Sequence, residues 1–258
     1  MRMPTDALNI QVNAGKWESA TFDPQTLDAL GFFVLRDVVQ TKSLNYLRKI
    51  YRDESKVSEI KGHPTKVSIN DEDTLPFIGQ QEIKELLKHF FQAKVGFGSG
   101  QFFRKDATHR GKVKLHNDLM YMSGWMEQYS FFVPLTLCSP ETGGLILYPG
   151  THKFGLLGDA GELNRDAIPE HLSVCQPKLN PGDLLIMNAA TWHESPEFLG
   201  SGERIYFEFK VKHKDDPSCN FLHIEESEYM SEYSLPSDSQ SLFVDSRLQR
   251  LKNLYKNN

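Results

Sequence analysis

The stretch YSFFVPLTLCSPETGGLILYPGTH, residues 129–152, contains two short apolar runs separated by the turn residues SPETGG. Short runs of apolar and aromatic residues bounded by Pro and Gly are typical of β-strands. The same texture recurs along the chain, at residues 100–105, 173–180, 182–188 and 204–212. Strands at this spacing predict a β-sandwich or barrel from about residue 95 onward.

The first third of the chain has a different pattern. Residues 22–40 predict a short helix, a break at Gly31 and then an apolar strand, and residues 41–56 predict a helix. The segment QQEIKELLKHFFQ, residues 80–92, has apolar residues at helical spacing. We therefore predict an α+β fold in one domain spanning 1–258. Its predicted parts are a helical N-terminal part at 20–94, a β core at about 95–212, and a C-terminal extension at 216–258 that ends in an amphipathic helix.

Composition narrows the class of protein. The chain has 258 residues, 39% hydrophobic and 24% charged, and a net charge of −5, which gives no global case for nucleic-acid or membrane binding. No apolar run approaches the ~20 residues of a membrane span, and the first residues lack a signal-peptide core. Three widely spaced cysteines fit neither a disulfide framework nor a zinc pair. We expect a cytoplasmic protein with a small-molecule partner, and find no signal for its oligomeric state.

A candidate metal site begins with His116 and Asp118, two residues apart in VKLHND. Chance produces such a pair in about one of two chains of this composition, so the pair needs support. Residues i and i+2 of a strand face one side, and His193, 75 residues after Asp118, could add a second imidazole. Two histidines and one carboxylate leave three positions of Fe(II) open for a cosubstrate and O2.

Two competing motifs are weaker. His213 and Asp215 repeat the spacing, but the next histidine, His223, lies in an acidic stretch without strand texture, which favours a solvated surface. The segment VGFGSGQ, residues 95–101, has G-x-G-x-G spacing and precedes a strand-like run, which argues against a dinucleotide site.

A candidate anchor for a carboxylate follows His193. Arg204 stands eleven residues after it, and Ser195 stands two residues after it. Arginine binds carboxylates through two parallel hydrogen bonds, and a serine hydroxyl can add a third. Such residues could hold the distal carboxylate of 2-oxoglutarate, whose keto-acid end would bind the iron.

Together with the segments LDALGFFVLRDVVQ and ETGGLILYPGTHK, these motifs resemble the phytanoyl-CoA dioxygenase family of Fe(II)/2-oxoglutarate oxygenases, over residues 25–211. The resemblance implies a double-stranded β-helix, a cupin-like jelly roll with flanking helices. It also implies iron on His116, Asp118 and His193, and the 5-carboxylate of 2-oxoglutarate on Arg204 and Ser195. Family members that halogenate carry Gly or Ala at the Asp118 position, so the resemblance favours hydroxylation here.

The sequence departs from the family pattern at two points. Arg204 shares a strand face with other polar residues, so it would point away from the iron if the opposite, apolar face filled the barrel interior; a bulge or a polar interior would restore the assignment. Relatives often have Asn thirteen residues before the first metal histidine, where this chain has Phe103. Gln101 and Thr136 are alternative 2-oxoglutarate contacts.

Candidate substrate contacts follow from neighbouring residues. Tyr121 and Trp125, just after Asp118, each combine an apolar ring with a polar group, although such runs are more often core. His152 resembles a family turn residue that borders the substrate space, and a structural role is an equal alternative. The basic segment at 104–114 is either a solvated loop or a patch that attracts an anionic substrate such as a phosphonate, phosphorylated sugar or acyl thioester.

These expectations combine into one function. The chain should hydroxylate a C–H bond of a small organic molecule, using Fe(II), O2 and 2-oxoglutarate and releasing succinate and CO2. Two alternatives remain: a cupin-like isomerase or epimerase that works without 2-oxoglutarate, and a non-catalytic jelly-roll binding module.

Overall fold

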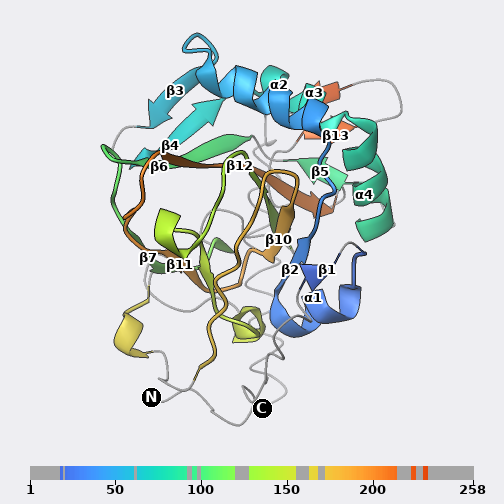
Figure 1. The fold of residues 1–258 in the computed structure, drawn as a ribbon. Coiled ribbons are helices and arrows are strands. Elements are labelled where there is room, and N and C mark those ends of the chain that lie inside the picture. Colours follow the sequence, from blue (N-terminus) through green and yellow to red (C-terminus); the bar gives the residue numbers. More distant parts are fainter. Residues whose placement is uncertain are drawn as a thin grey trace, which may run out of the picture.

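The computed structural model describes residues 18–19, 21–60, 63–91, 95–97, 100–119, 128–154, 163–167, 172–213, 222–224 and 229–231. Within these ranges two β-sheets are accompanied by helices that come mostly from the N-terminal third (Figure 1). The predicted α+β jelly roll with flanking helices is therefore confirmed. The proposed domain limits remain a prediction, and the expected C-terminal helix lies outside the described residues.

The larger sheet has a main path of eight strands. In spatial order these are β1 (Glu18–Ser19), β2 (Phe32–Leu35), β10 (Leu184–Asn188), β8 (Gln128–Pro134), β12 (Glu203–His213), β5 (Val95–Phe97), β13 (Leu222–Ile224) and β14 (Tyr229–Ser231). A branch beside β12 consists of β6 (Gln101–Asp106), β4 (His63–Ile69) and β3 (Val57–Ile60). The smaller sheet has the order β7 (Val113–His116), β11 (His193–Ser195) and β9 (Ile146–Leu147).

The helices are α1 (Pro24–Leu30), α2 (Thr41–Arg52), α3 (Asp71–Ile78) and α4 (Gln81–Phe91), and short 3-10 turns lie at Pro140–Thr142, Thr151–Phe154 and Arg165–Ala167. Three of these four helices, α1, α2 and α4, lie in segments that the sequence predicts as helical. The Asp23 side chain accepts a hydrogen bond from the N–H of Gln25 at the start of α1. Gly31 ends the helix at φ 82°, a left-handed conformation that favours glycine. In the described part of the chain, no helix is long and apolar enough to cross a membrane.

The N-terminal part contributes strands as well as helices, which the sequence did not predict for residues 54–81. The hairpin β3–β4 and helix α3 form there, and β4 pairs with β6 at the side of the larger sheet. A half-exposed hairpin buries few of its side chains, so its sequence stays polar and lacks the apolar texture by which strands are recognised.

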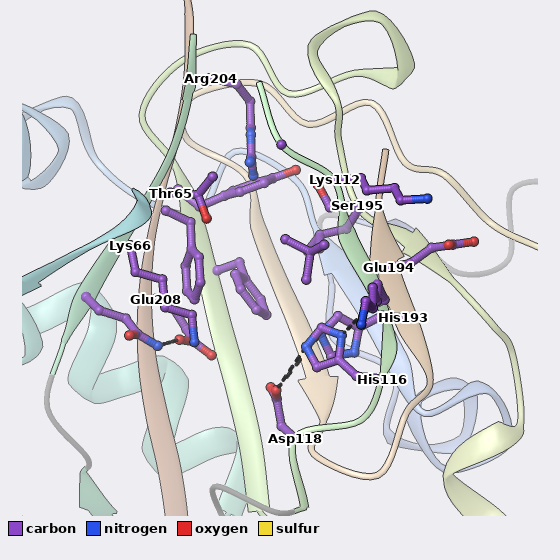
Figure 2. Close-up of a pocket in the computed structure, with 18 of the residues that line it drawn as sticks. Thr65, Lys66, Lys112, His116, Asp118, His193, Glu194, Ser195, Arg204 and Glu208 are labelled. Atoms are coloured by element: carbon purple, nitrogen blue, oxygen red, sulfur yellow. Dashed lines mark hydrogen bonds and ion pairs between the residues drawn. The ribbon is translucent and has the colours of Figure 1, made fainter. Parts of the chain in front are cut away.

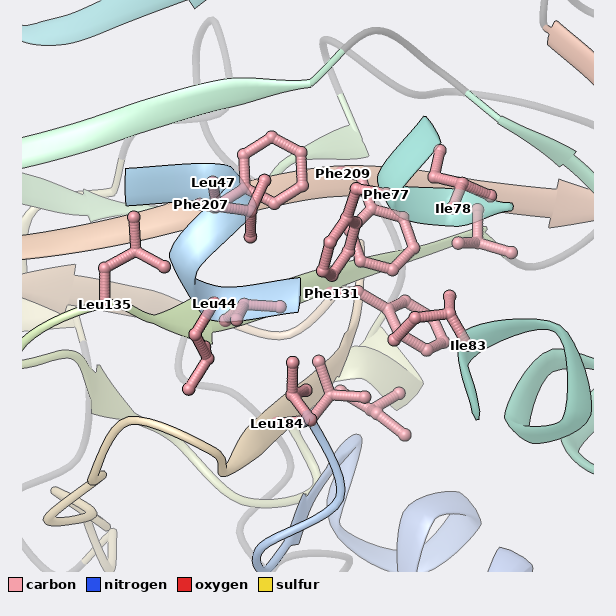
Figure 3. Close-up of a cluster of buried hydrophobic side chains, with 14 of the residues drawn as sticks. Leu44, Leu47, Phe77, Ile78, Ile83, Phe131, Leu135, Leu184, Phe207 and Phe209 are labelled. Atoms are coloured by element: carbon pink, nitrogen blue, oxygen red, sulfur yellow. The ribbon is translucent and has the colours of Figure 1, made fainter. Parts of the chain in front are cut away.

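The main hydrophobic core lies between the outer face of the larger sheet and the helices. Phe207 and Phe209 of β12 pack there beside Phe77 of α3, with ring centroids 5.2 and 5.8 Å from Phe77 (Figure 3). The opposite, inner face of β12 is left for polar side chains. Burial of each large apolar side chain contributes about 1.5–3 kcal/mol, so this outer layer is a main source of stability.

Candidate active site

Three predicted metal ligands converge on one point. The ligand atoms of His116, Asp118 and His193 all lie within 4.8 Å of one another, and this is the one such group found among the described residues. His116 and His193 are opposite each other in the antiparallel pair β7–β11, and their ring centroids are 4.1 Å apart. Asp118 Oδ1 lies 3.6 Å from His116 Nε2 and 4.0 Å from His193 Nε2. The set has the composition that a mononuclear Fe(II) centre requires.

Backbone carbonyls determine which nitrogen of each ring faces the site. His116 Nδ1 lies 2.8 Å from the carbonyl oxygen of Lys114, and His193 Nδ1 lies 3.0 Å from that of Thr191. Because a carbonyl can only accept, each Nδ1 must donate its hydrogen, and each Nε2 then keeps a lone pair for a cation. Both rings are therefore oriented as metal-binding imidazoles.

Asp118 lies just beyond the strand that carries His116, because β7 ends at His116. The N–H of Asp118 donates to the carbonyl oxygen of Ala189 at 2.8 Å, which ties it to the turn after β10. Its Oδ2 accepts from the hydroxyl of Ser130 at 3.2 Å. These contacts leave Oδ1 directed at the two histidines. The carboxylate thus faces the site although Asp118 does not lie in the strand, as the sequence had suggested it would.

Electrostatics favour a neutral histidine and an ionised carboxylate here. Burial, with a further contribution from His193, lowers the pKa of His116 to about 4. Burial acts to raise the pKa of Asp118, but the neighbouring His193, Lys210 and His116 outweigh it and the pKa is lowered. These are the protonation states that a cation needs at its ligands.

The three residues open into a cavity of about 340 Å³ between the two sheets. Figure 2 shows Arg204 at one end, Asp118 at the other, and Lys66 and Glu208 on the wall opposite the histidines. Its lining residues come from β4, β6, β8, β12, β7 and β11 and from the segments beside β7 and β9: Thr65, Lys66, Gln101, Phe103, Gly111, Lys112, Val113, Lys114, His116, Asp118, Phe132, Leu145, His193, Glu194, Ser195, Arg204, Tyr206, Glu208 and Lys210.

Arg204 points into this cavity, because the apolar face of β12 packs outward against the helices. The interior between the sheets is therefore polar at this strand, and the polar face of β12, with Arg204, is the one that faces the proposed metal site. Arg204 is 3% exposed, its guanidinium lies 4.7 Å from the centroid of the Tyr206 ring, and its Nε has no hydrogen-bond partner among the described residues. Ser195 also lines the cavity, and its hydroxyl donates to the carbonyl oxygen of Gly143 at 2.8 Å. An arginine buried in this way needs an anion.

Lys105 is a buried cation that the sequence did not single out. It pairs opposite Arg204 across β6 and β12, is fully buried, and donates to the carbonyl oxygens of Ser195 and Pro196. Burial and the charge of Arg204 lower its pKa to about 7, against the opposing effect of Glu197. In the sequence, Lys105 stands out only as one member of a basic segment. Its position opposite Arg204 follows from the pairing of β6 with β12, which the sequence does not reveal.

The two alternatives for the missing Asn are separated by the structure. Gln101 lines the cavity and its side-chain amide donates to Glu208. Thr136 is not among the lining residues, because its hydroxyl accepts the N–H of Ile205 at 2.8 Å and so fastens the end of β12. Phe103 itself forms part of the cavity wall.

The predicted substrate contacts fare differently. His152 lies away from the cavity: its Nε2 is 2.9 Å from the carbonyl oxygen of Asp28, and its ring abuts Gly31, where any Cβ would clash with it. The structural alternative accounts for this position. Tyr121 and Trp125 lie outside the described residues, as does Asp215 of the competing pair.

Comparison with known proteins agrees with this geometry. Residues 31–206 match the model of the family described as Phytanoyl-CoA dioxygenase (PhyH). The chain has two β-sheets with a His-Asp-His group between them, and it belongs to the phytanoyl-CoA dioxygenase family. A search of curated protein sequences finds no match.

Several solved structures are similar. EvdO2 from Micromonospora carbonacea var. aurantiaca complexed with 2-oxoglutarate has a TM-score of 0.62 at 16% identity, over 84% of this chain and 96% of that one. HygX from Streptomyces hygroscopicus, with nickel, 2-oxoglutarate and hygromycin B bound, has a TM-score of 0.59 at 16% identity, over 75% and 88%. The epimerase SnoN, in complex with Fe3+, alpha ketoglutarate and nogalamycin RO, has a TM-score of 0.63 at 13% identity, over 83% and 94%. At these identities the likeness establishes the fold.

Proposed function

We propose that the chain is an Fe(II)- and 2-oxoglutarate-dependent oxygenase that hydroxylates a C–H bond of a small organic molecule, with release of succinate and CO2. The observation that carries the proposal is the convergence of His116, Asp118 and His193 within 4.8 Å. Both histidines present Nε2 to the site, and the carboxylate is the harder ligand that Fe(II) prefers beside two imidazoles. Membership of the phytanoyl-CoA dioxygenase family supports the same chemistry.

The cosubstrate assignment is supported by the far end of the cavity. Arg204 and Ser195 would hold the distal carboxylate of 2-oxoglutarate, with Gln101 on the adjoining wall. Bound Fe(II) and 2-oxoglutarate would supply the oxidation of the C–H bond by O2. The chain's own residues orient the reactants, and Phe103, Phe132 and Leu145 of the cavity wall limit access of water. Asp118 would occupy the coordination position that a halide would otherwise need.

A second candidate is stereochemical inversion or ring closure with the same cosubstrate. It is favoured by two similar structures, the alpha ketoglutarate dependent epimerase SnoN and the carbocyclase SnoK from nogalamycin biosynthesis. Mass spectrometry of the product separates the three: hydroxylation adds one oxygen atom, epimerisation leaves the mass unchanged, and cyclisation removes two hydrogens.

The decisive test is anaerobic addition of Fe(II) and 2-oxoglutarate, monitored for the visible charge-transfer band of the chelate. We expect the band in the wild type, its loss in His193→Ala, and its retention in the matched control His109→Ala, whose ring pairs with Asp106 outside the cavity. Loss of a ligand should weaken metal binding by more than the roughly 10–100-fold typical of outer-shell partners. A wild type without the band would contradict the proposal.

The remaining alternatives make different predictions. An isomerase that works without 2-oxoglutarate would keep metal-dependent turnover in Arg204→Ala. A non-catalytic binding module would release no succinate with any metabolite in a screen. The two described cysteines, Cys138 and Cys175, are buried and unbridged, in keeping with the reducing, cytoplasmic setting that we propose.

A further inference from the structure

Two buried cations stand next to each other at the proposed cosubstrate anchor. Lys105 of β6 and Arg204 of β12 are directly opposite in the antiparallel pair, and they are 0% and 3% exposed. Side chains in such positions leave the same face of the sheet with Cβ atoms about 4.5–5.5 Å apart, and like charges there repel each other. Arg204 lines the cavity, whereas Lys105 is not among the described lining residues.

No acid in the described part of the chain forms an ion pair with either cation. The charge of Glu197 acts on Lys105 from beyond ion-pair distance. Cys138 and Tyr206 act on Arg204, but burial raises the pKa of the Cys138 thiol to about 12 and that of Tyr206 well above its usual value, so both are neutral near pH 7. A buried charge without an anionic partner costs free energy.

Two backbone carbonyls hold Lys105 in place in either of its charge states. Its Nζ donates to the carbonyl oxygen of Ser195, at 3.3 Å, and to that of Pro196. A neutral amine keeps two hydrogens, so both hydrogen bonds persist when the third proton is lost. Burial, followed by the charge of Arg204, lowers the pKa of Lys105 to about 7 against the opposing effect of Glu197. Lys105 can therefore change its charge near neutral pH without changing its position.

The charge of Arg204 connects Lys105 to the cavity. An anion bound to the guanidinium would offset the positive charge that disfavours a proton on Lys105, so the pKa of Lys105 would rise. At pH 8, a rise of one would increase the protonated fraction of Lys105 from about one tenth to about one half. Binding at Arg204 would thus draw a proton from solution onto a residue that does not touch the ligand.

We propose that Lys105 is a positioning residue of the cosubstrate anchor, which takes up a proton when the distal carboxylate of 2-oxoglutarate binds to Arg204. The assignment rests on the proposed function, in that 2-oxoglutarate occupies this cavity. Proton uptake on binding has a definite sign: affinity is highest where Lys105 is already protonated, and it falls as the pH rises. A rise of one in the pKa corresponds to an affinity for 2-oxoglutarate that falls about fivefold between pH 7 and pH 9.

The test is calorimetric titration of 2-oxoglutarate into the anaerobic, Fe(II)-loaded enzyme at pH 8, in HEPES and in Tris. The dependence of the heat on the ionisation enthalpy of the buffer gives the number of protons taken up. Lys105→Met keeps the length of the side chain and removes its charge, so it should take up about 0.4 proton less per 2-oxoglutarate than the wild type. The matched control Lys42→Met, on the exposed side of α2, should take up as many protons as the wild type.

A second ligand tests the same point without changing the protein. 2-Oxovalerate keeps the keto-acid end and has a methyl group in place of the distal carboxylate, so the wild type should take up about 0.4 proton less with it. This comparison holds even if Lys105→Met fails to fold. Equal uptake with the two ligands, or equal uptake by the wild type and the folded variant, would overturn the assignment. An absent chelate band counts against the proposed function, whereas a band without Lys105-dependent proton uptake counts against this inference alone.

Discussion

The two faces of β12 differ in chemistry although they belong to one strand. Ile205, Phe207 and Phe209 face outward into the main core, whereas Arg204 and Glu208 face inward to the cavity and are almost as deeply buried. The outer face buries apolar surface beneath the helices. The inner face holds charge away from water, which costs free energy unless a ligand or a neighbour compensates it.

The outer face of β12 therefore contributes mainly to stability, and the inner face mainly to ligand binding. Because the helices complete the core on the outer face, substitutions there should change the free energy of unfolding and leave ligand affinity intact. Substitutions of the cavity-lining residues on the inner face should chiefly change ligand affinity. The predictions that follow test this separation, beginning with the largest expected effect.

Phe207→Ala should destabilise the protein by about 3–5 kcal/mol, because a fully buried ring in contact with three other rings leaves a cavity when it is removed. Denaturant unfolding measures the change. At a temperature where the variant is folded, its affinity for 2-oxoglutarate should equal that of the wild type. A large loss of affinity in the folded variant would mean that the two layers are coupled.

Arg204→Met should weaken 2-oxoglutarate binding by about 10–100-fold, the equivalent of charged hydrogen bonds worth about 1.5–3 kcal/mol. Titration of the chelate band measures this, and Fe(II) binding alone should persist. The control is Arg104→Met, which removes an arginine from the adjacent strand where the guanidinium pairs with Glu59 instead. Equal effects of the two substitutions would remove Arg204 from its assigned role.

Lys105 makes stability depend on pH in a predictable direction. The pKa of Lys105 is about 7 in the folded protein, whereas an unperturbed lysine has a pKa of 10.5. Between these two values the unfolded chain therefore binds more protons than the folded protein. Stability should therefore rise with pH above 7, by at most about 1.4 kcal/mol per pH unit from this group. The cost of burying the charged lysine is present in full below pH 7.

The measurement is the difference in unfolding free energy between the wild type and Lys105→Met at pH 7, 8 and 9. Other groups titrate equally in both proteins, so the difference isolates Lys105. A pH-independent difference would show that the lysine is not perturbed by its burial beside Arg204.

The smallest effect is expected at Thr136. Thr136→Val removes the acceptor for the N–H of Ile205 and should cost about 1 kcal/mol of stability. The affinity for 2-oxoglutarate, measured by the same chelate titration, should not change. A loss of 2-oxoglutarate affinity without a loss of stability would show that Thr136 contacts the cosubstrate.

Much of the fold was predictable because its strands and helices carry strong local signals. The helix that ends at Gly31 and the strand that follows are an example: the sequence shows a glycine followed by an apolar run, and the structure places that glycine at φ 82° and buries the run as β2. The hairpin β3–β4 was missed because its burial is slight and its residues are polar. For the same reason the sequence did not identify Lys66 of β4 as a residue that lines the cavity.

The grouping of the three proposed metal ligands was predictable from their spacing, but their arrangement was not. Residue spacing suggested that His116 and Asp118 share a strand, whereas β7 ends at His116. The backbone of Asp118 is held by the carbonyl oxygen of Ala189 and its carboxylate by the hydroxyl of Ser130, both distant in sequence. The β12 pattern showed two faces without showing which one meets the cavity, because that depends on where the helices pack. Long-range pairing, as between Lys105 and Arg204, leaves no local trace.

The hydrogen bonds from the two histidine rings to the main-chain oxygens of Lys114 and Thr191 have an evolutionary consequence. Every amino acid provides such an oxygen, so replacing the side chain at either position leaves the acceptor in place. Ring orientation and tautomer are therefore insulated from most point mutations in the surroundings. Residues that choose the substrate can diversify while the reactive centre keeps its competence, which makes this scaffold tolerant of changes in specificity.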